Sequence, residues 1–285
     1  MKRFIICLLF TLCTLSLAQQ SAEWRSWNQP VPPFHVAGNI YYVGANEITS
    51  FLITSPQGHI LLDGGFAETA PQIEANIEKL GFRLRDFKVM LNSQAHSDHA
   101  GGFAELKRAT GARLLIAPGD AELIARGGHD DFAFGDSMAY PPTKPDGTFK
   151  DGEEIRVGSA VMTAHITPGH TRGCTTWTTK VTEQGKSYDV TFLCSVSAPG
   201  YNLVNNAKYP NIVDDYRDSF RRLKAMHTDI FLASHGSFFH LEEKRHAIGA
   251  GKPNPFIVPT EFSTFMESSE KAFNAQLAQQ QAKAK

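Results

Sequence analysis

The sequence lacks an excess of charge of either sign. Its 285 residues include 28 lysines and arginines against 29 aspartates and glutamates, which gives a formal net charge of −1. Because a protein that follows a phosphate backbone needs clustered positive charge, this balance argues against nucleic acid as a partner. With 42% hydrophobic residues the chain can bury a globular core, and we expect its ligand to be a small molecule.

Long apolar runs are also scarce, and the one that stands out lies at the amino end. It extends from Phe4 to Leu17 after a basic start. This run is shorter than the ~20 residues that a membrane-spanning helix needs. It predicts a cleaved signal peptide over residues 1–18. We therefore expect a periplasmic or secreted protein that is not membrane-bound after cleavage. Residues 19–285 are expected to form a single domain of two similar halves. The sequence leaves the oligomeric state open.

Cysteine is rare, since the chain has four and cleavage after residue 18 would leave only Cys174 and Cys194. The two flank a predicted β-hairpin, centred near Gln184, in which TTWTTKV and YDVTFLC pair. An exported protein folds under oxidising conditions, so a disulfide across this hairpin is possible. Two buried free thiols are an equally acceptable outcome, because only some cross-strand registers suit disulfide geometry.

Short apolar strands alternate with turns and helices along the rest of the chain. The strand-like segments are NIYYVG, SFLIT, GHILLDGG, FKVML, ARLLIAP, AVMTAHI and DIFLASHG. Apolar residues recur at helical spacing in 73–80, 103–106 and 213–223, and a last helix from Thr260 is expected to fray in QLAQQQAKAK. Groups of strands covered by helices predict an α/β fold in which two sheets pack together with helices on the outside.

A long loop over residues 127–151 is rich in glycine, proline and aspartate and carries apolar side chains, among them Phe134 and Met138. Loops of this length inside a compact domain are often functional. Side chains that only fix the loop to the core would explain the same composition.

Four of the eleven histidines lie in tight turns directly after apolar strands: His96 and His99 in SQAHSDHAGG, His170 in ITPGHTRG and His235 in FLASHGS. Such turns can gather residues from distant parts of a chain at one edge of the sheets. Imidazole and carboxylate groups are zinc ligands. Neighbouring residues of one loop point in different directions, so Asp98 and the two histidines around it fit two adjacent metal positions better than one. The alternative explanation is that Asp98 and these histidines only satisfy backbone groups of the turn.

These motifs resemble the metallo-β-lactamase superfamily, whose pattern is H-x-H-x-D-H, then G-H-T, then a late histidine. The resemblance implies an αββα sandwich with two zinc sites. The implied ligands are Gln94, His96 and His170 in the first site, and Asp98, His99 and His235 in the second. It further implies that Asp63, in LLDGG, hydrogen-bonds a ligand histidine and fixes its tautomer.

The segments GGHDDFAFGDSMAYPP and SVSAPGYNLV narrow the resemblance to the subclass B3 β-lactamases. That subclass implies hydrolysis of the cyclic amide of β-lactam antibiotics by zinc-activated water, which Asp98 would orient. It implies that Ser195 and Ser197 donate to the substrate carboxylate, and that Phe134 and Met138 form an apolar wall over the drug. Turn capping and core packing are the simpler explanations of these four residues.

Two other functions stay open, one because the same fold hosts many substrates and one because of a departure from the family pattern. Related lactonases and thioesterases usually have a metal-bridging aspartate after the hairpin, where this chain reads CSVSAPG, so a hydrolase of that kind is the less favoured alternative. Gln94 stands where the family has a histidine, which also allows a non-catalytic zinc-binding periplasmic protein. Because an amide oxygen is a poorer zinc ligand than imidazole, we expect a weakened first site and an intact second one.

Overall fold

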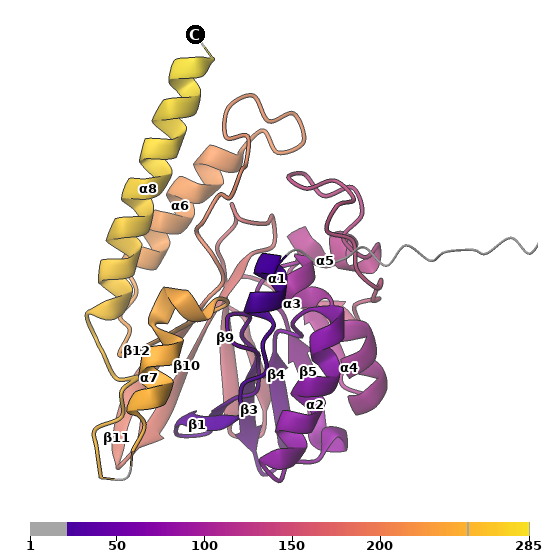
Figure 1. Cartoon of the computed structure of the whole chain (residues 1–285), viewed down its shortest axis with the longest axis vertical. Coiled ribbons are helices and arrows are strands. Elements are labelled where there is room, and N and C mark those ends of the chain that lie inside the picture. The colour runs from indigo at the N-terminus through magenta and orange to yellow at the C-terminus, as the bar shows by residue number, and fades with distance from the viewer. Residues whose placement is uncertain (1–21, 250, 285) are drawn as a thin grey trace, which may run out of the picture.

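The computed structural model describes residues 22–249 and 251–284, so the predicted signal peptide lies outside the described residues. Its strands form two sheets (Figure 1). The first sheet has seven strands, in the order β1 (Phe34–Ala37), β2 (Ile40–Tyr42), β3 (Phe51–Ser55), β4 (Gly58–Leu62), β5 (Phe87–Leu91), β6 (Arg113–Ile116) and β7 (Gly147–Thr148). The second has five, in the order β12 (Ile230–Ala233), β11 (Lys186–Leu193), β10 (Thr175–Glu183), β9 (Ala160–Ile166) and β8 (Glu154–Val157).

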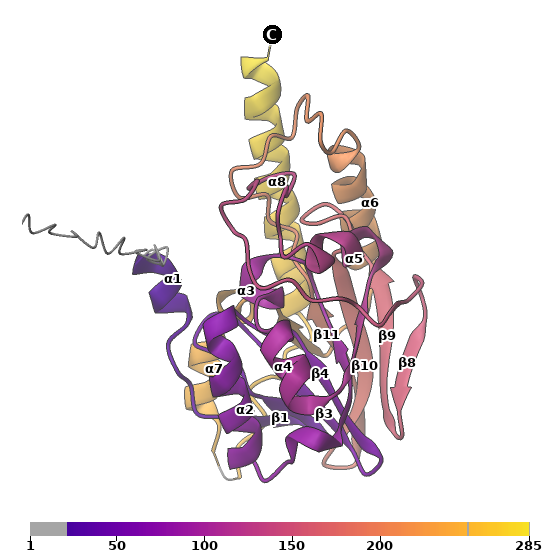
Figure 2. The same ribbon diagram turned by 90° about the vertical axis from the view of Figure 1, so that its right-hand side faces the viewer.

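Helices cover the outer faces of both sheets, which confirms the α/β sandwich. The α-helices are α1 (Ala22–Trp27), α2 (Ala70–Lys79), α3 (Ser97–Ala100), α4 (Phe103–Thr110), α5 (Pro118–Ala125), α6 (Ile212–Lys224), α7 (Leu241–Ala247) and α8 (Glu261–Lys283). Short 3₁₀ turns are η1 (Ala67–Thr69), η2 (Leu84–Asp86) and η3 (Gly236–Phe239). Figures 1 and 2 show α2 and α4 together on one side of the molecule, and α6 beside α8 on the other.

The strands of the first sheet read as continuous apolar runs because both of their faces are buried. In β4, Ile60 and Leu62 face the core between the sheets, whereas Leu61 faces the cluster under α2 and α4. The sheets meet through aromatic contacts, such as that of Phe51 in β3 with Phe192 in β11, whose ring centroids are 5.1 Å apart. This packing holds the ends of strands from both sheets at one edge.

The predicted hairpin forms, with β10 and β11 antiparallel and a turn at Gln184. Cys174 and Cys194 form a disulfide with a Cα–Cα distance of 5.9 Å. The bond lies just beyond the end of the ladder, whose last pair is Trp177 and Phe192. Of the two outcomes that the sequence left open, the structure has the disulfide.

The C-terminal helix does not fray where the sequence predicted that it would. Helix α8 continues to Lys283, because side chains in its second half are anchored to the loop after β11. Gln276 donates through Nε2 to the carbonyl of Ala198 at 2.8 Å, and Gln280 donates to that of Tyr201 at 2.7 Å. Throughout the described part of the chain, no helix is both long enough and apolar enough to cross a membrane.

Candidate metal centre

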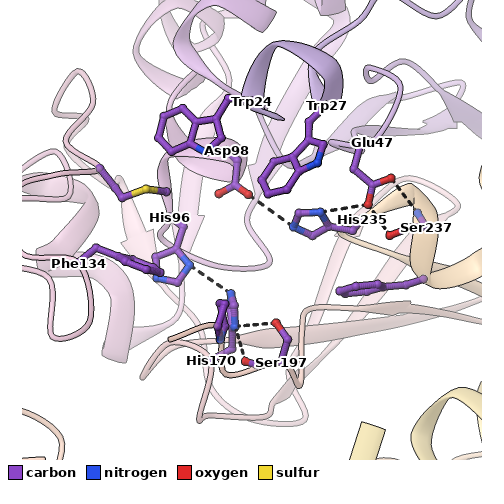
Figure 3. A pocket seen from close by; sticks show the side chains of 13 residues that line it. Trp24, Trp27, Glu47, His96, Asp98, Phe134, His170, Ser197, His235 and Ser237 are labelled. Carbon is purple, nitrogen blue, oxygen red and sulfur yellow. Dashed lines mark hydrogen bonds and ion pairs between the residues drawn. The ribbon is translucent and has the colours of Figure 1, made fainter. Parts of the chain in front are cut away.

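The histidine-bearing turns meet at one edge of the sandwich (Figure 3). The loop with His96 and His99 follows β5, and part of it forms the short helix α3. His170 lies in the turn between β9 and β10, and His235 follows β12. Strand ends of both sheets therefore supply the side chains, as the sequence predicted from the positions of the turns.

The first group of candidate ligands consists of Gln94, His96 and His170, all buried. Nδ1 of His96 lies 2.8 Å from Oε1 of Gln94 and 3.2 Å from Nε2 of His170. The amide oxygen of Gln94 and the two ring nitrogens therefore lie close together. An oxygen and two imidazole nitrogens that converge in this way could hold a metal ion.

The second group consists of Asp98, His99 and His235. Oδ2 of Asp98 lies 3.2 Å from Nε2 of His99 and 3.5 Å from Nε2 of His235, and the two Nε2 atoms are 3.3 Å apart. Three donors that face one another at these distances fit an ion that lies about 2 Å from each of them. This group is a candidate metal site by its donor set as well as by its geometry.

Burial and the neighbouring groups set the charges of the ligands. Burial lowers the pKa of His96 and holds that of His170 well below its ordinary value, so both rings are neutral and have a free lone pair. Burial acts to raise the pKa of Asp98, but His99 and His235 beside it hold that pKa well below its ordinary value. Asp98 is therefore a carboxylate, the form that binds a cation.

A carboxylate also stands behind the second-site ligand His235, which sequence reasoning missed. Oε1 of Glu47 lies 3.4 Å from Nδ1 of His235, and Glu47 accepts hydrogen bonds from the amide and hydroxyl of Ser237. Burial acts to lower the pKa of His235, whereas Asp98 and Glu47 raise it to about 9. The metal-free ring is therefore a cation at neutral pH, and Glu47 would keep the proton on Nδ1 while a metal displaces the proton on Nε2.

Asp63 was expected to hydrogen-bond a ligand histidine, and its geometry in the structure is looser. Its Oδ2 lies 3.8 Å from Nδ1 of His99, beyond hydrogen-bond length. The carboxylate instead accepts hydrogen bonds from the side chain of Asn92 and from both the amide and hydroxyl of Ser93, at 2.6–3.1 Å. Asp63 thus faces the ligand His99 without the predicted hydrogen bond, and its bonds go to Asn92 and Ser93 at the start of the ligand loop.

Asp131 occupies the corresponding place behind His96, and sequence reasoning missed it too. Its Oδ2 is 4.0 Å from Nε2 of His96, and neither atom has a hydrogen-bond partner among the described residues. Its Oδ1 accepts hydrogen bonds from the amides of Ala133 and Phe134, each at 2.8 Å. Asp131 thus connects the long loop to the first ligand group.

Asp120, which no motif marks, ties together the two loops that supply the first ligand group. Its carboxylate accepts hydrogen bonds from the amide of Ala95 at 3.0 Å, from the hydroxyl of Thr171 at 2.7 Å and from the amide of Gly173 at 2.7 Å. Burial raises the pKa of Asp120 to about 6. A Cβ at Gly173 would come within 2.7 Å of Cγ of Asp120, so this contact requires glycine.

The two serines predicted to bind substrate have different environments. Ser197 is exposed and lines the cavity over the ligands, and its carbonyl oxygen accepts a hydrogen bond from Nδ1 of His170 at 2.8 Å. Ser195 is buried, and its Oγ accepts a hydrogen bond from the amide of Ser197 at 3.2 Å. Ser195 therefore has the contacts of a turn-capping residue, and its predicted bond to the substrate carboxylate stays a prediction.

The cavity over the two ligand groups has a volume of about 600 Å³, and Phe134 and Met138 of the long loop line it. The same loop is also fixed to the ligand loop, because the hydroxyl of Tyr140 donates to the carbonyl of Ala95 at 2.6 Å. Two tryptophans of α1, Trp24 and Trp27, complete one wall (Figure 3). No spacing in the sequence indicated that these tryptophans would reach the cavity.

Comparison with known proteins gives matches of sequence and of structure. Residues 43–183 match the family described as the metallo-beta-lactamase superfamily. A metallo-β-lactamase of Cronobacter sakazakii is 42% identical, with a TM-score of 0.88 over 92% of this chain and 100% of that one. BJP-1, a subclass B3 metallo-β-lactamase of Bradyrhizobium japonicum, is 39% identical, with a TM-score of 0.86 over 92% of this chain and 99% of that one.

A more distant sequence match is the hydroxyacylglutathione hydrolase of Methylococcus capsulatus, which is 37% identical over 107 residues. That match covers 38% of this chain and only 33% of the relative. The structural matches, in contrast, span nearly the whole length of both chains. The chain therefore belongs to the metallo-β-lactamase superfamily, and within it to the subclass B3 group.

Proposed function

We propose that this protein is a zinc-dependent β-lactamase, which hydrolyses the cyclic amide bond of penicillins, cephalosporins and carbapenems. The observation that carries the proposal is the pair of adjacent ligand groups at the base of one cavity large enough for a drug-sized molecule. The likeness to metallo-β-lactamases along the whole domain supports it.

The chain's own residues divide the work of such a reaction. Zinc, when bound, would supply a water acidic enough to act as a nucleophile at neutral pH. The carboxylate of Asp98 faces the cavity and would orient this water by accepting a hydrogen bond. The exposed hydroxyl of Ser197 would donate to the substrate carboxylate, and Phe134 with Met138 would cover the bound drug.

The two sites would differ in strength because their donors differ. Gln94 offers a neutral amide oxygen, whereas the second site has two imidazoles and a charged carboxylate. We expect one or two zinc ions, with the site of Asp98, His99 and His235 the tighter of the two.

We also propose that the protein acts in the periplasm or outside the cell. The apolar amino-terminal segment of residues 1–18 has the form of a signal peptide. The disulfide of Cys174 and Cys194 supports this location, since disulfides persist mainly in oxidising compartments. There the activity would give resistance to β-lactam antibiotics.

The proposal is tested by comparing three substrates with the purified protein: a chromogenic cephalosporin, a lactone and a thioester. We expect the cephalosporin to be turned over fastest, the activity to vanish in chelator and to return with zinc. Preferred turnover of the thioester would instead favour the function of the hydroxyacylglutathione hydrolase relatives. Zinc binding without turnover of any of the three would indicate a non-catalytic binding protein.

A further inference from the structure

A second cavity adjoins the metal cavity on the side of α8. It has a volume of about 330 Å³ and lies between the segment of α8 from Phe265 to Gln276 and the loop after β11. Ser197, Pro199 and Phe238 line both cavities, so the two cavities share this wall.

The lining of this second cavity is mainly apolar. Phe265, Ala272 and Phe273 of α8 form one side, and Phe238 stands at the junction with the metal cavity. No charged side chain lines it among the described residues. Its amide group, that of Gln276, is already used by the carbonyl of Ala198. A ligand group that enters it would be stabilised by burial of apolar surface rather than by ion pairs.

Aromatic rings connect the second metal site to α8. The ring of Phe238 lies 5.2 Å from that of His235 and 5.1 Å from that of Phe265. A substituent that reaches the second cavity from the metal site would run along this shared wall, past Phe238 and the exposed Ser197. Ring-bearing groups suit such walls, because aromatic pairs prefer centroid distances of about 4.5–7 Å.

One wall of this cavity is held in place by packing between α8 and α6. Phe273 contacts Tyr216 and Phe220 of α6, with ring centroids 4.7 Å and 5.6 Å away. The opposite wall is held by the hydrogen bond between Gln276 and Ala198. A cavity that exists before binding costs little ordering of the protein when it is filled.

We propose that this second cavity, the α8 subsite, accepts an apolar, ring-bearing substituent of a β-lactam whose reactive amide lies at the metal centre. The inference rests on the proposed function and adds to it a preference among substrates. Penicillins with an aromatic acyl side chain would gain affinity from the α8 subsite, whereas the unsubstituted penicillin nucleus would not reach it.

The test uses Ala272→Trp, a substitution in α8 that reduces the volume of the α8 subsite. Ala272 is exposed and lines the subsite, so the larger ring would fill it. Ala275→Trp is the matched control, because Ala275 is exposed on the same helix but does not line the cavity. Ser269→Phe, from another lining position, is a second filling variant.

The quantity measured is the ratio of kcat/KM for a benzyl-substituted penicillin to that for the unsubstituted nucleus, in zinc-replete proteins with equal metal content. We expect the ratio to fall roughly tenfold in Ala272→Trp and in Ser269→Phe, mainly through KM, and to stay at the native value in Ala275→Trp. Equal ratios in the native protein and all three variants would overturn the α8 subsite alone. Failure of the native protein to hydrolyse either substrate would overturn the proposed function and the subsite with it.

Discussion

Gln94 gives the first ligand group its distinctive chemistry. Its Oε1 stands 2.8 Å from Nδ1 of His96, so it occupies a ligand position but offers a neutral oxygen. Zinc prefers imidazole nitrogen at such a position. The residue is therefore expected to weaken one metal site without removing it.

We predict that Gln94→His raises the affinity of the first site for zinc. The gain should be at least as large as the about 10- to 100-fold effect on metal affinity of residues that hydrogen-bond to ligands without binding the metal themselves. Competitive titration with a chelating dye would show two unequal affinities in the native protein and more similar ones in the variant. Two equally tight sites in the native protein would contradict this explanation.

Carboxylates stand behind three of the ligand histidines, and Glu47 makes the closest contact of the three. Its Oε1 is 3.4 Å from Nδ1 of His235, against 3.8 Å for Asp63 and His99 and 4.0 Å for Asp131 and His96. A charged partner on Nδ1 orients the ring and increases the basicity of Nε2. Glu47 is thus a positioning residue for the second site.

We predict that Glu47→Gln lowers the zinc affinity of the second site about 10- to 100-fold, because a neutral amide holds the Nδ1 proton less strongly. Isothermal titration calorimetry with zinc would measure the change in affinity. Glu243→Gln is the matched control, since Glu243 is exposed on α7. The same loss of affinity in both variants would exclude a specific role for Glu47.

At this scale, residues in motifs could be predicted and isolated residues could not. His96, Asp98 and His99 share one loop, so their spacing alone indicated metal binding. Glu47 and Asp120 are single acids in segments far from the ligands in sequence. Only the fold brings them to the site, and nothing local distinguishes them from surface acids.

At the scale of elements, α7 and α8 are joined by a buried ion pair. Nζ of Lys244 contacts Oε2 of Glu261, and the ammonium lies 5.8 Å and 5.6 Å from the ring centroids of Phe239 and Phe256. Burial lowers the pKa of Lys244 and raises that of Glu261, so each charge depends on the other. This pair helps to fix the start of α8.

We predict that Lys244→Met lowers the free energy of unfolding by about 3 kcal/mol, because it leaves the carboxylate of Glu261 buried without its partner. The double variant Lys244→Met/Glu261→Leu should recover most of this loss, since an apolar pair needs no desolvation of charge. Urea denaturation of the three proteins would measure both effects. If the double variant is as unstable as the single one, the ion pair stabilises the fold more than an apolar pair at the same positions, and the prediction is wrong.

Long, strongly patterned elements could be predicted, but their ends and the shortest strands could not. Strand β9 begins and ends at the same residues as the predicted segment AVMTAHI. The two-residue β7 has too little pattern to be recognised. The end of α8 is held by Gln276 and Gln280, whose contacts lie in a loop distant in sequence, so composition alone wrongly suggested fraying.

At the scale of the whole molecule, the disulfide reinforces the region beside the metal centre. Cys174 follows the turn of His170, and Cys194 precedes the loop of Ser197. The bond therefore ties together two segments that contribute to the cavity. The sequence could indicate that the two cysteines are close. Whether they form a disulfide depends on how β10 and β11 are aligned, which only the structure shows.

We predict that Cys174→Ala/Cys194→Ala lowers the free energy of unfolding by about 3 kcal/mol, as expected for a disulfide that closes a loop of about 20 residues. Guanidinium denaturation of the variant and of the oxidised native protein would measure the difference. Equal stability of the two proteins would show that hairpin packing alone orders this region.

The whole fold places ligands from both sheets at one edge, and the central claim is that this edge hydrolyses β-lactams with zinc held mainly by Asp98, His99 and His235. The most direct test adds zinc stepwise to chelator-treated protein, and follows bound metal by elemental analysis together with hydrolysis of a chromogenic cephalosporin, a penicillin and a carbapenem. We predict that hydrolysis rises with the first zinc to bind. No hydrolysis of any of the three in zinc-saturated protein would contradict the claim.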